Sequence, residues 1–136
     1  DEREPLQLRC TDGASHLGLL TDLGHASPHV LQQLQGCHAL LLEANHDPDM
    51  LAASGYPAFL KRRIAGVHGH LANHDAAGIL AAVRHTGLNR VVAAHLSAQN
   101  NQPQLAQHAL AHALGWPAEG VDIASATAGT DWINVV

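Results

Sequence analysis

The fold is decided by the stretch His38-Ala39-Leu40-Leu41-Leu42-Glu43. A continuous apolar run of this kind is typical of a β-strand that is buried on both of its faces. A second run of the same character, Val91-Val92-Ala93-Ala94, follows later in the chain. Buried strands of this type need helices packed on their sheet, so the two runs predict an α/β fold.

Signals for helices alternate with these runs. Ser27-Pro28 supplies an N-cap residue and a proline for the first helical position, which predicts a helix to about residue 35. Apolar residues that recur on one face predict a second helix over residues 73–84, with Asn73 as its N-cap. Gln102-Pro103 opens a third helix that ends at Gly115. Two shorter helical pieces are expected over residues 48–53 and 57–64.

Further strands are expected at both ends of the chain. Residues 6–10 and 17–21, joined by the turn Thr11-Asp12-Gly13, predict a hairpin. Residues 121–124 and 132–136 are predicted to be closing strands. No repeat or linker interrupts the chain, so residues 1–136 are expected to lie in one domain with a mixed β-sheet.

The composition restricts the classes of partner. The formal net charge is -5, which argues against loose electrostatic binding to nucleic acid or to an anionic membrane. A phosphate-bearing substrate stays open, because bound divalent cations would reverse the charge inside a site. No apolar run has the length of a membrane span, and Asp1-Glu2-Arg3-Glu4-Pro5 does not resemble a signal peptide. We therefore expect a cytoplasmic protein without a membrane partner.

The two cysteines, Cys10 and Cys37, lie far apart and form no CxxC pair. In a reducing cytoplasm they are expected to be free, buried thiols. Histidine is abundant, with twelve residues, and it is the commonest metal ligand. Abundance alone is weak evidence, so the position of each histidine in the fold decides whether it is a candidate for a site.

Three polar clusters occur at or near the ends of apolar strands. They are Thr21-Asp22-Leu23-Gly24, Glu43-Ala44-Asn45-His46-Asp47 and Ala94-His95-Leu96-Ser97. Loops that leave the carboxyl ends of buried strands are where α/β folds bind ligands. The sequence therefore predicts one functional site built from these clusters.

Together with Gly69-His70-Leu71-Ala72-Asn73, these clusters resemble, in order and spacing, the C-terminal half of the metallo-β-lactamase superfamily. The branch that they resemble most is the YycJ/WalJ type, regarded as DNA exonucleases. Two stretches match that branch in particular, Leu60-Lys61-Arg62-Arg63-Ile64 and Ser97-Ala98-Gln99-Asn100-Asn101. The resemblance implies half of an αββα sandwich, a mixed β-sheet with helices on its outer face.

The resemblance also implies roles for three residues. Asp22 would be the carboxylate that bridges two metal ions about 3.5–4 Å apart. His95 would be the last histidine ligand of the second ion, with its other ring nitrogen held by a neighbouring group. His70 would lie beside the scissile phosphate, without binding metal, and would stabilise charge or protonate the leaving oxygen.

Other polar residues have two interpretations each. Glu43 and Asn45 could orient the ligands from behind, while His46 and Asp47 could begin the next helical turn. His25 is as plausibly a loop residue as a site residue. The basic run of Lys61, Arg62 and Arg63 could contact a phosphate backbone or form a solvated helix face. His108 and His112 are expected to be surface histidines.

The expected function is a metal-dependent hydrolase, most plausibly a phosphodiesterase or nuclease of exonuclease type. It would act on nucleic acid through a hydroxide activated by two divalent ions, which could be zinc, manganese or iron. One alternative is a thioester or lactone hydrolase of the same fold, and another is a non-catalytic structural or partner-binding fragment. The basic run Lys61–Arg63 and the Gly69-His70 pair favour the phosphodiester substrate.

One departure from the superfamily pattern is large. The H-x-H-x-D-H motif, which supplies most metal ligands, is absent, and the stretch from His68 to Asp75 has the wrong spacing to replace it. The acidic start, Asp1 to Pro5, resembles the segment that follows a further ligand histidine in this branch. We therefore expect residues 1–136 to be a C-terminal half that is inactive alone and needs the N-terminal half of the same domain. A homo-oligomer is left open.

Overall fold

The computed structural model describes residues 6–135, and it contains one five-stranded mixed sheet with the strand order β1-β2-β3-β4-β5. The strands are β1 (Leu6–Thr11), β2 (His16–Thr21), β3 (Ala39–Glu43), β4 (Arg90–Ala94) and β5 (Val121–Ile123). The helices are α1 (Pro28–Leu34), α2 (Pro48–Ala53), α3 (Ala58–Ala65), α4 (Asn73–Val83) and α5 (Pro103–Leu114), and a 3-10 turn, η1 (Ala118–Gly120), precedes β5. The resemblance noted for residues 1–5 lies outside the described residues.

The predicted hairpin is confirmed. Strands β1 and β2 pair antiparallel, with Leu8 opposite Leu19. The turn between them is held by Asp12, whose Oδ1 accepts hydrogen bonds from the backbone nitrogens of Ala14 and Ser15. Gly13 has a φ of 97°, a conformation that glycine adopts without strain.

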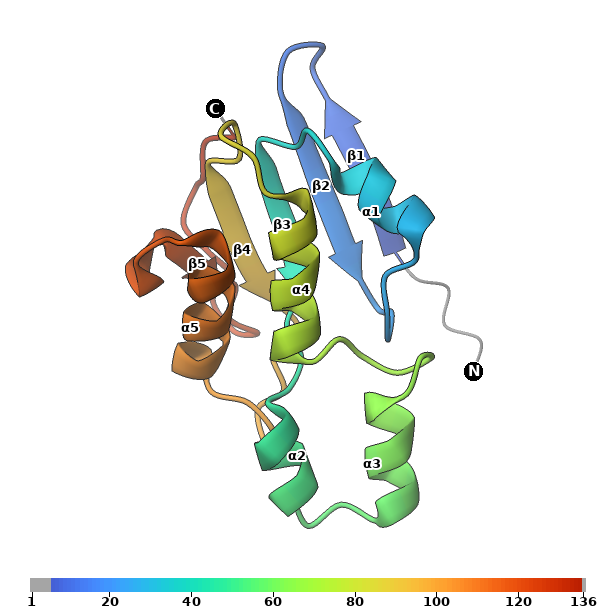
Figure 1. Ribbon diagram of the computed structural model, residues 1–136. Helices are drawn as coiled ribbons and strands as arrows, with labels where there is room; N and C mark the ends of the chain where they lie inside the picture. Colours follow the sequence, from blue (N-terminus) through green and yellow to red (C-terminus); the bar gives the residue numbers. More distant parts are fainter. Residues whose placement is uncertain (1–5, 136) are drawn as a thin grey trace.

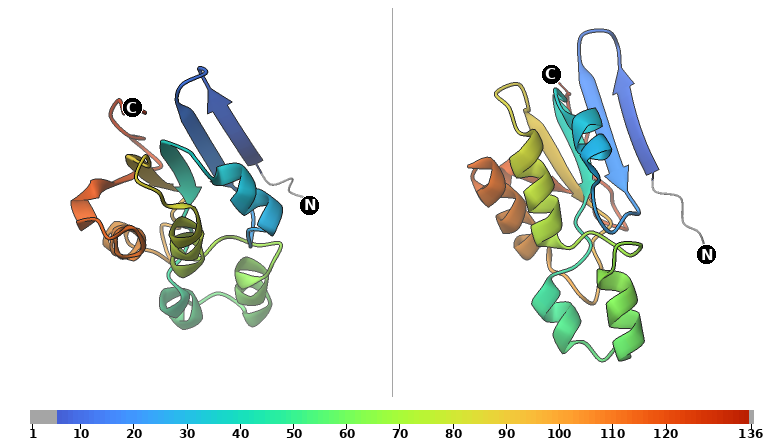
Figure 2. Two further views of the ribbon diagram at one scale, coloured as in Figure 1. Left: turned by 45° about the horizontal axis from the view of Figure 1, so that its top comes forward. Right: turned by 45° about the vertical axis from the view of Figure 1, so that its right-hand side comes forward.

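Strands β2 to β5 are all parallel, and the helices α1, α4 and α5 cover one face of the sheet (Figures 1 and 2). Helix α4 packs between α1 and α5. The side chains of Leu20, Leu42, Leu80, Val91 and Leu110 are almost fully buried between these layers. This arrangement confirms the predicted α/β class and the mixed sheet with helices on one face.

The other face of the sheet carries a row of apolar side chains. Leu8, Leu19, Leu41 and Val92 are register partners across four adjacent strands. Successive residues of a strand point to opposite faces of the sheet. Gly18 faces Leu34 of α1, so Leu19 and the rest of the row point away from the helices. Leu8 is 47% exposed, so the described residues leave this row partly open to solvent at its β1 end.

The capping signals in the sequence mark most helix ends correctly. Ser27 Oγ accepts from Val30 N at 3.3 Å at the start of α1, and Gly115 ends α5 with a φ of 71°. The prediction of Asn73 as an N-cap is wrong. The N-cap is Ala72, whose backbone N–H donates to Asp75 at 3.1 Å, and Asn73 is the buried first residue of α4.

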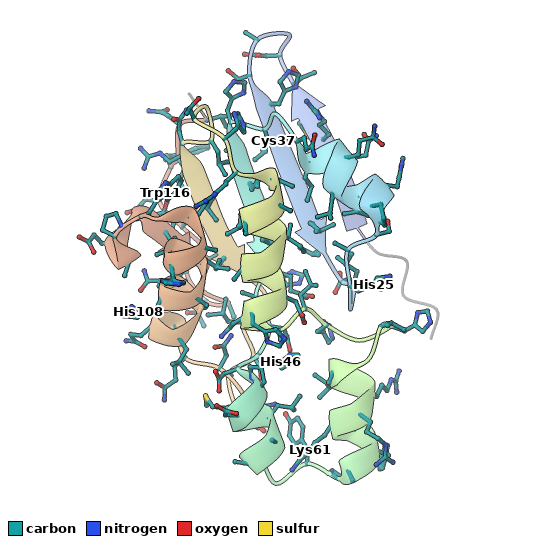
Figure 3. All side chains as sticks on the ribbon, viewed as in Figure 1. His25, Cys37, His46, Lys61, His108 and Trp116 are labelled. Carbon is teal, nitrogen blue, oxygen red and sulfur yellow. The ribbon has the colours of Figure 1, made fainter. Side chains whose placement is uncertain are left out.

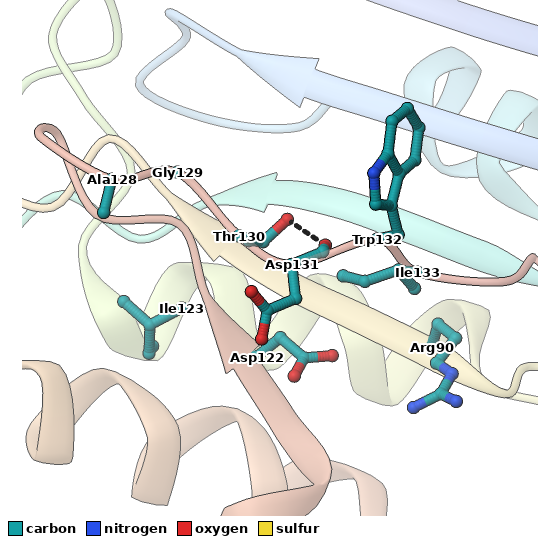
Figure 4. Close-up of a pocket in the computed structure, with 9 residues that line it drawn as sticks. All are labelled: Arg90, Asp122, Ile123, Ala128, Gly129, Thr130, Asp131, Trp132 and Ile133. Carbon is teal, nitrogen blue, oxygen red and sulfur yellow. Dashed lines mark hydrogen bonds between the residues drawn. The ribbon is translucent and has the colours of Figure 1, made fainter.

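The predicted closing strand over residues 132–136 is wrong for the residues that the structure describes. After β5 the chain turns between Ser125 and Gly129 and runs on without regular structure (Figure 4). Apolar residues such as Trp132 and Ile133 suggested a strand, but a strand needs a partner for its backbone hydrogen bonds. Trp132 is instead fully exposed, beside a cavity of about 370 Å³ that Arg90 and Asp122 help to line.

Both cysteines are free, as predicted. Cys37 is buried, and its burial raises the pKa of its thiol, an effect that the positive charge of Arg9 only partly opposes. Cys10 is exposed on β1, so its predicted burial is wrong for the residues described. Among residues 6–135, no helix is long and apolar enough to cross a membrane.

Candidate metal centre at the carboxyl edge of the sheet

The three predicted polar clusters meet at one edge of the sheet. Asp22 directly follows β2, Glu43 is the last residue of β3, and His95 directly follows β4. These strands are parallel neighbours, so their carboxyl ends lie side by side. His70 reaches the same place from the loop between α3 and α4.

Asp22 and His95 share an unusual backbone conformation. They have φ values of 62° and 57°, and they are the only residues besides glycine with positive φ in the described chain. This left-handed conformation costs other residues about 1–3 kcal/mol and is concentrated at functional sites. Each strand therefore ends in a strained turn that carries a candidate ligand.

Glu43 lies at the centre of the cluster and is completely buried. Its Oε1 lies 3.1 Å from Nδ1 of His70 and 3.3 Å from Nδ1 of His95, while its Oε2 accepts from Leu71 N at 3.2 Å. If the neutral ring of His95 donates its Nδ1 proton to this carboxylate, its lone pair lies on Nε2, the usual arrangement behind a metal-binding histidine. Glu43 can therefore fix the orientation of both rings.

The cluster offers a suitable set of metal donors. Single ligand atoms of Asp22, Glu43 and His70 all lie within 4.8 Å of one another. The Nδ1 atom of His95 lies 3.9 Å from Oδ1 of Asp22. Carboxylates and imidazoles at such distances suit zinc, manganese or iron, so the residues present fit a divalent metal. The geometry admits His70 as a ligand, and its role without metal contact stays a prediction.

Asn45 and His46 hold the backbone next to the metal cluster in place. Asn45 donates from Nδ2 to the backbone oxygen of His95 at 3.0 Å, and its Oδ1 lies 3.2 Å from Nδ1 of His46. His46 is buried beside the start of α4 (Figure 3). Burial lowers the pKa of His46 because it disfavours the imidazolium, and the carboxylate of Asp75 opposes this only in part. The ring is therefore neutral at pH 7 and suited to positioning.

A buried amide pair ties the surrounding loops together. Asn73 and Asn101 exchange two side-chain hydrogen bonds of 2.9 Å, and Asn101 also donates to the backbone oxygen of Ala44 at 3.0 Å. The sequence gives no signal for this pair, because a single asparagine at the start of a helix is also a common capping residue. Its effect is to hold the loops after β3 and β4 against α4.

Two glycines allow close backbone packing around the loop of His70: Gly24, from the loop of Asp22, and Gly69, against the end of α3. A Cβ atom at Gly24 would overlap the backbone of Gly66 and Val67, and one at Gly69 would overlap the backbone oxygens of Ile64 and Arg63. The glycines are therefore required by close packing of backbone against backbone.

Gly69→Ala is expected to lower the free energy of unfolding by about 1–3 kcal/mol, because the added methyl group meets immobile backbone. The matched control is Gly78→Ala in α4, where a Cβ would meet nothing within 4 Å. That change should raise the free energy of unfolding by about 0.5–1 kcal/mol. Urea unfolding followed by circular dichroism measures both, and equal stability of the two variants would contradict the packing described for Gly69.

The remaining candidates lie further from the cluster. Lys61 donates from Nζ to the backbone oxygen of Ala52 at 2.7 Å, so it links α3 to α2, whereas Arg62 and Arg63 are exposed in the last turn of α3. His25 is an exposed loop residue, 3.4 Å from the backbone oxygen of Val67. Asp47 caps α2 through Met50 N. His108 and His112 are exposed on α5, as expected for surface histidines. Figure 3 shows His108 on this helix.

The fold and the site together define a class of protein. The chain matches the crystal structure of the metallo-β-lactamase fold protein YhfI from Bacillus subtilis with a TM-score of 0.63 at 16% identity, over 93% of this chain and 43% of that one. The chain therefore has a metallo-β-lactamase fold, as the sequence motifs predicted.

The sequence is similar to two named proteins. It is 34% identical over 131 residues to Exodeoxyribonuclease YycJ of Bacillus anthracis, covering 96% of this chain and 50% of the relative. It is 32% identical over 105 residues to Exodeoxyribonuclease WalJ of Streptococcus pneumoniae, covering 77% of this chain and 39% of the relative. No protein-family model matches. These similarities confirm the predicted resemblance to the YycJ/WalJ branch, and the chain spans half or less of the length of these relatives.

Proposed function

We propose that the complete protein is a metal-dependent phosphodiesterase that removes nucleotides from the ends of DNA. The observation that carries the proposal is the cluster of Asp22, Glu43, His70 and His95 at the carboxyl edge of the sheet. The names of the similar proteins, both exodeoxyribonucleases, support DNA as the substrate.

Asp22 and His95 would hold divalent metal in this proposal. When bound, a divalent ion lowers the pKa of a coordinated water and offsets the negative charge of a phosphate. Glu43 would keep the rings of His70 and His95 in place through their Nδ1 atoms. His70 would stabilise charge on the departing oxygen or give it a proton.

Two metal ions need more donors than residues 6–135 offer at the site. A catalytic zinc ion alone takes about three protein ligands. We propose that the missing ligands come from the N-terminal half of the same domain, since the similar proteins are at least twice as long as the matched region. That half would pack on the open row of Leu8, Leu19, Leu41 and Val92.

We propose a lesser role for the basic run in α3. Arg62 and Arg63 are exposed, and α3 leads directly into the loop of His70, where His70 N donates to Ile64 O at 2.9 Å. If Arg62 or Arg63 contacts a phosphate, its replacement by alanine should weaken the salt dependence of DNA binding. The slope of the logarithm of the binding constant against the logarithm of the salt concentration should fall by about one. An unchanged slope in Arg62→Ala and Arg63→Ala would mean that both arginines belong to a solvated helix face and contact no phosphate.

The function is tested by assaying the complete protein, loaded with manganese or zinc, on end-labelled DNA and on thioester substrates. We expect release of mononucleotides from DNA, abolished by a chelator and restored by metal, without thioester hydrolysis. Thioester or lactone hydrolysis without action on DNA would overturn the phosphodiesterase assignment. Absence of all hydrolysis with metal bound would favour a structural role.

A further inference from the structure

A second cavity lies directly beside the candidate metal centre. Its volume is about 380 Å³, within the range of small-molecule sites. The loop after β4 and the segment after β5 form its walls, and His95 belongs both to this cavity and to the metal cluster. A ligand in the cavity could therefore extend to a group bound at Asp22.

The lining of the cavity is largely aliphatic. Leu96, Ile123, Pro103 and several alanines form most of it, and apart from His95 the lining contains no basic or acidic residue. Such walls suit an uncharged, flat group and give no counter-charge to a second phosphate. The imidazole of His95 is the one aromatic ring in the lining, so most of the group would lie against aliphatic surfaces.

Asn101 also lines the cavity, but its amide is bonded to Asn73, Ala44 and Gln102. Two hydroxyl groups supply the polar character that is open to a ligand. Ser97 Oγ accepts from Asn100 N at 3.0 Å, and Ser125 Oγ accepts from Ala128 N at 2.8 Å. Within residues 6–135 neither hydroxyl donates its own hydrogen to a recorded partner. Both can therefore donate to oxygen or nitrogen acceptors, which the edges of all nucleobases possess.

We propose that this cavity binds the nucleoside part of the nucleotide whose phosphate is held at the metal centre. The inference rests on the proposed function, because it assigns the substrate phosphate to the cluster of Asp22 and His95. The hydroxyl donors meet acceptors common to all bases, so the cavity should bind all four nucleosides with similar affinity.

Filling the cavity tests the proposal. Ala98 lines it from an exposed loop position, so Ala98→Leu should occupy it without disturbing the core. The control is Ala82→Leu at an exposed position of α4. Calorimetry on the complete metal-loaded protein would compare deoxyadenosine 5′-monophosphate with deoxyribose 5-phosphate, which lacks the base. Burying roughly 60 Å² of base surface predicts about 10-fold tighter binding of the nucleotide.

This difference should disappear in Ala98→Leu and persist in Ala82→Leu. Metal content should stay at the wild-type level in both variants and hydrolysis of a nitrophenyl phosphodiester should be unchanged in Ala82→Leu, while KM for DNA rises in Ala98→Leu. Equal affinity of the wild-type protein for both phosphates, with intact phosphodiester hydrolysis, would overturn the cavity proposal and leave the proposed function standing. Failure of the wild-type protein to bind either phosphate or hydrolyse either substrate would overturn both.

Discussion

His70→Ala in the complete protein is expected to lower turnover on DNA by about 10²–10⁴-fold, the usual contribution of a positioned general acid. Bound metal should stay at the wild-type level. The physical reason is that His70 is held by buried Glu43, with Nδ1 3.1 Å from the carboxylate, so its loss removes a group that acts in the transition state. Turnover and metal content, measured on the same preparation, check this result.

The substrate gives an internal control for this prediction. A nitrophenyl phosphodiester has a good leaving group that needs little protonation, so His70→Ala should affect its hydrolysis much less than that of DNA. His112→Ala, an exposed histidine of α5, should leave both activities near wild type. Loss of metal in step with activity would make His70 a ligand, which the geometry allows. Unchanged turnover on DNA would make it an ordinary loop residue.

Asp22→Ala is expected to remove bound metal and activity together. Substitution of a residue that hydrogen-bonds to a metal ligand typically lowers metal affinity or activity about 10–100-fold. Loss of a direct ligand should therefore lower metal affinity by more than about 100-fold. Asp22→Asn separates charge from backbone effects, since asparagine also tolerates the left-handed conformation found at Asp22, where φ is 62°. Both variants should lose metal, measured by elemental analysis.

The thermal stability of these variants should not fall in step with their activity. Asp22→Asn keeps the backbone conformation and removes a half-buried charge, so in the absence of metal its thermal unfolding should match or exceed that of the metal-free wild-type protein. Full metal occupancy in Asp22→Asn and Asp22→Ala would contradict the assignment of Asp22 as a ligand. A cooperative loss of folding in Asp22→Asn would show that the residue is required for structure.

The fold was predictable where local chemistry and tertiary packing agree. The apolar run of β3 is buried apart from Leu41, which is partly buried on the face away from the helices. Ser27 and Asp47 begin their helices, and Gly115 ends its helix, as such residues usually do. The position of the site was also predictable, because parallel strands bring their carboxyl ends to one edge. Asp22, Glu43 and His95 therefore lie together although they are far apart in sequence.

Other features depend on distances that a sequence does not contain. Nothing in the residues around Glu43 indicates that one buried oxygen contacts both His70 and His95, since this follows from how two loops converge. The strained backbone of Asp22 and His95 is equally hidden in the sequence, because aspartate and histidine occur in many ordinary turns. Local propensity also failed at Trp132, because residues 130–135 pair with no strand among the residues described.

The central claim is that Asp22 and His95 bind divalent metal in the complete protein, with Glu43 behind His95. Anomalous diffraction from crystals grown with manganese or zinc measures this directly. The account predicts a metal peak at about 2.0–2.2 Å from a carboxylate oxygen of Asp22 and from Nε2 of His95, whose Nδ1 stays against Glu43. Metal bound elsewhere, with no peak at either residue, would contradict it.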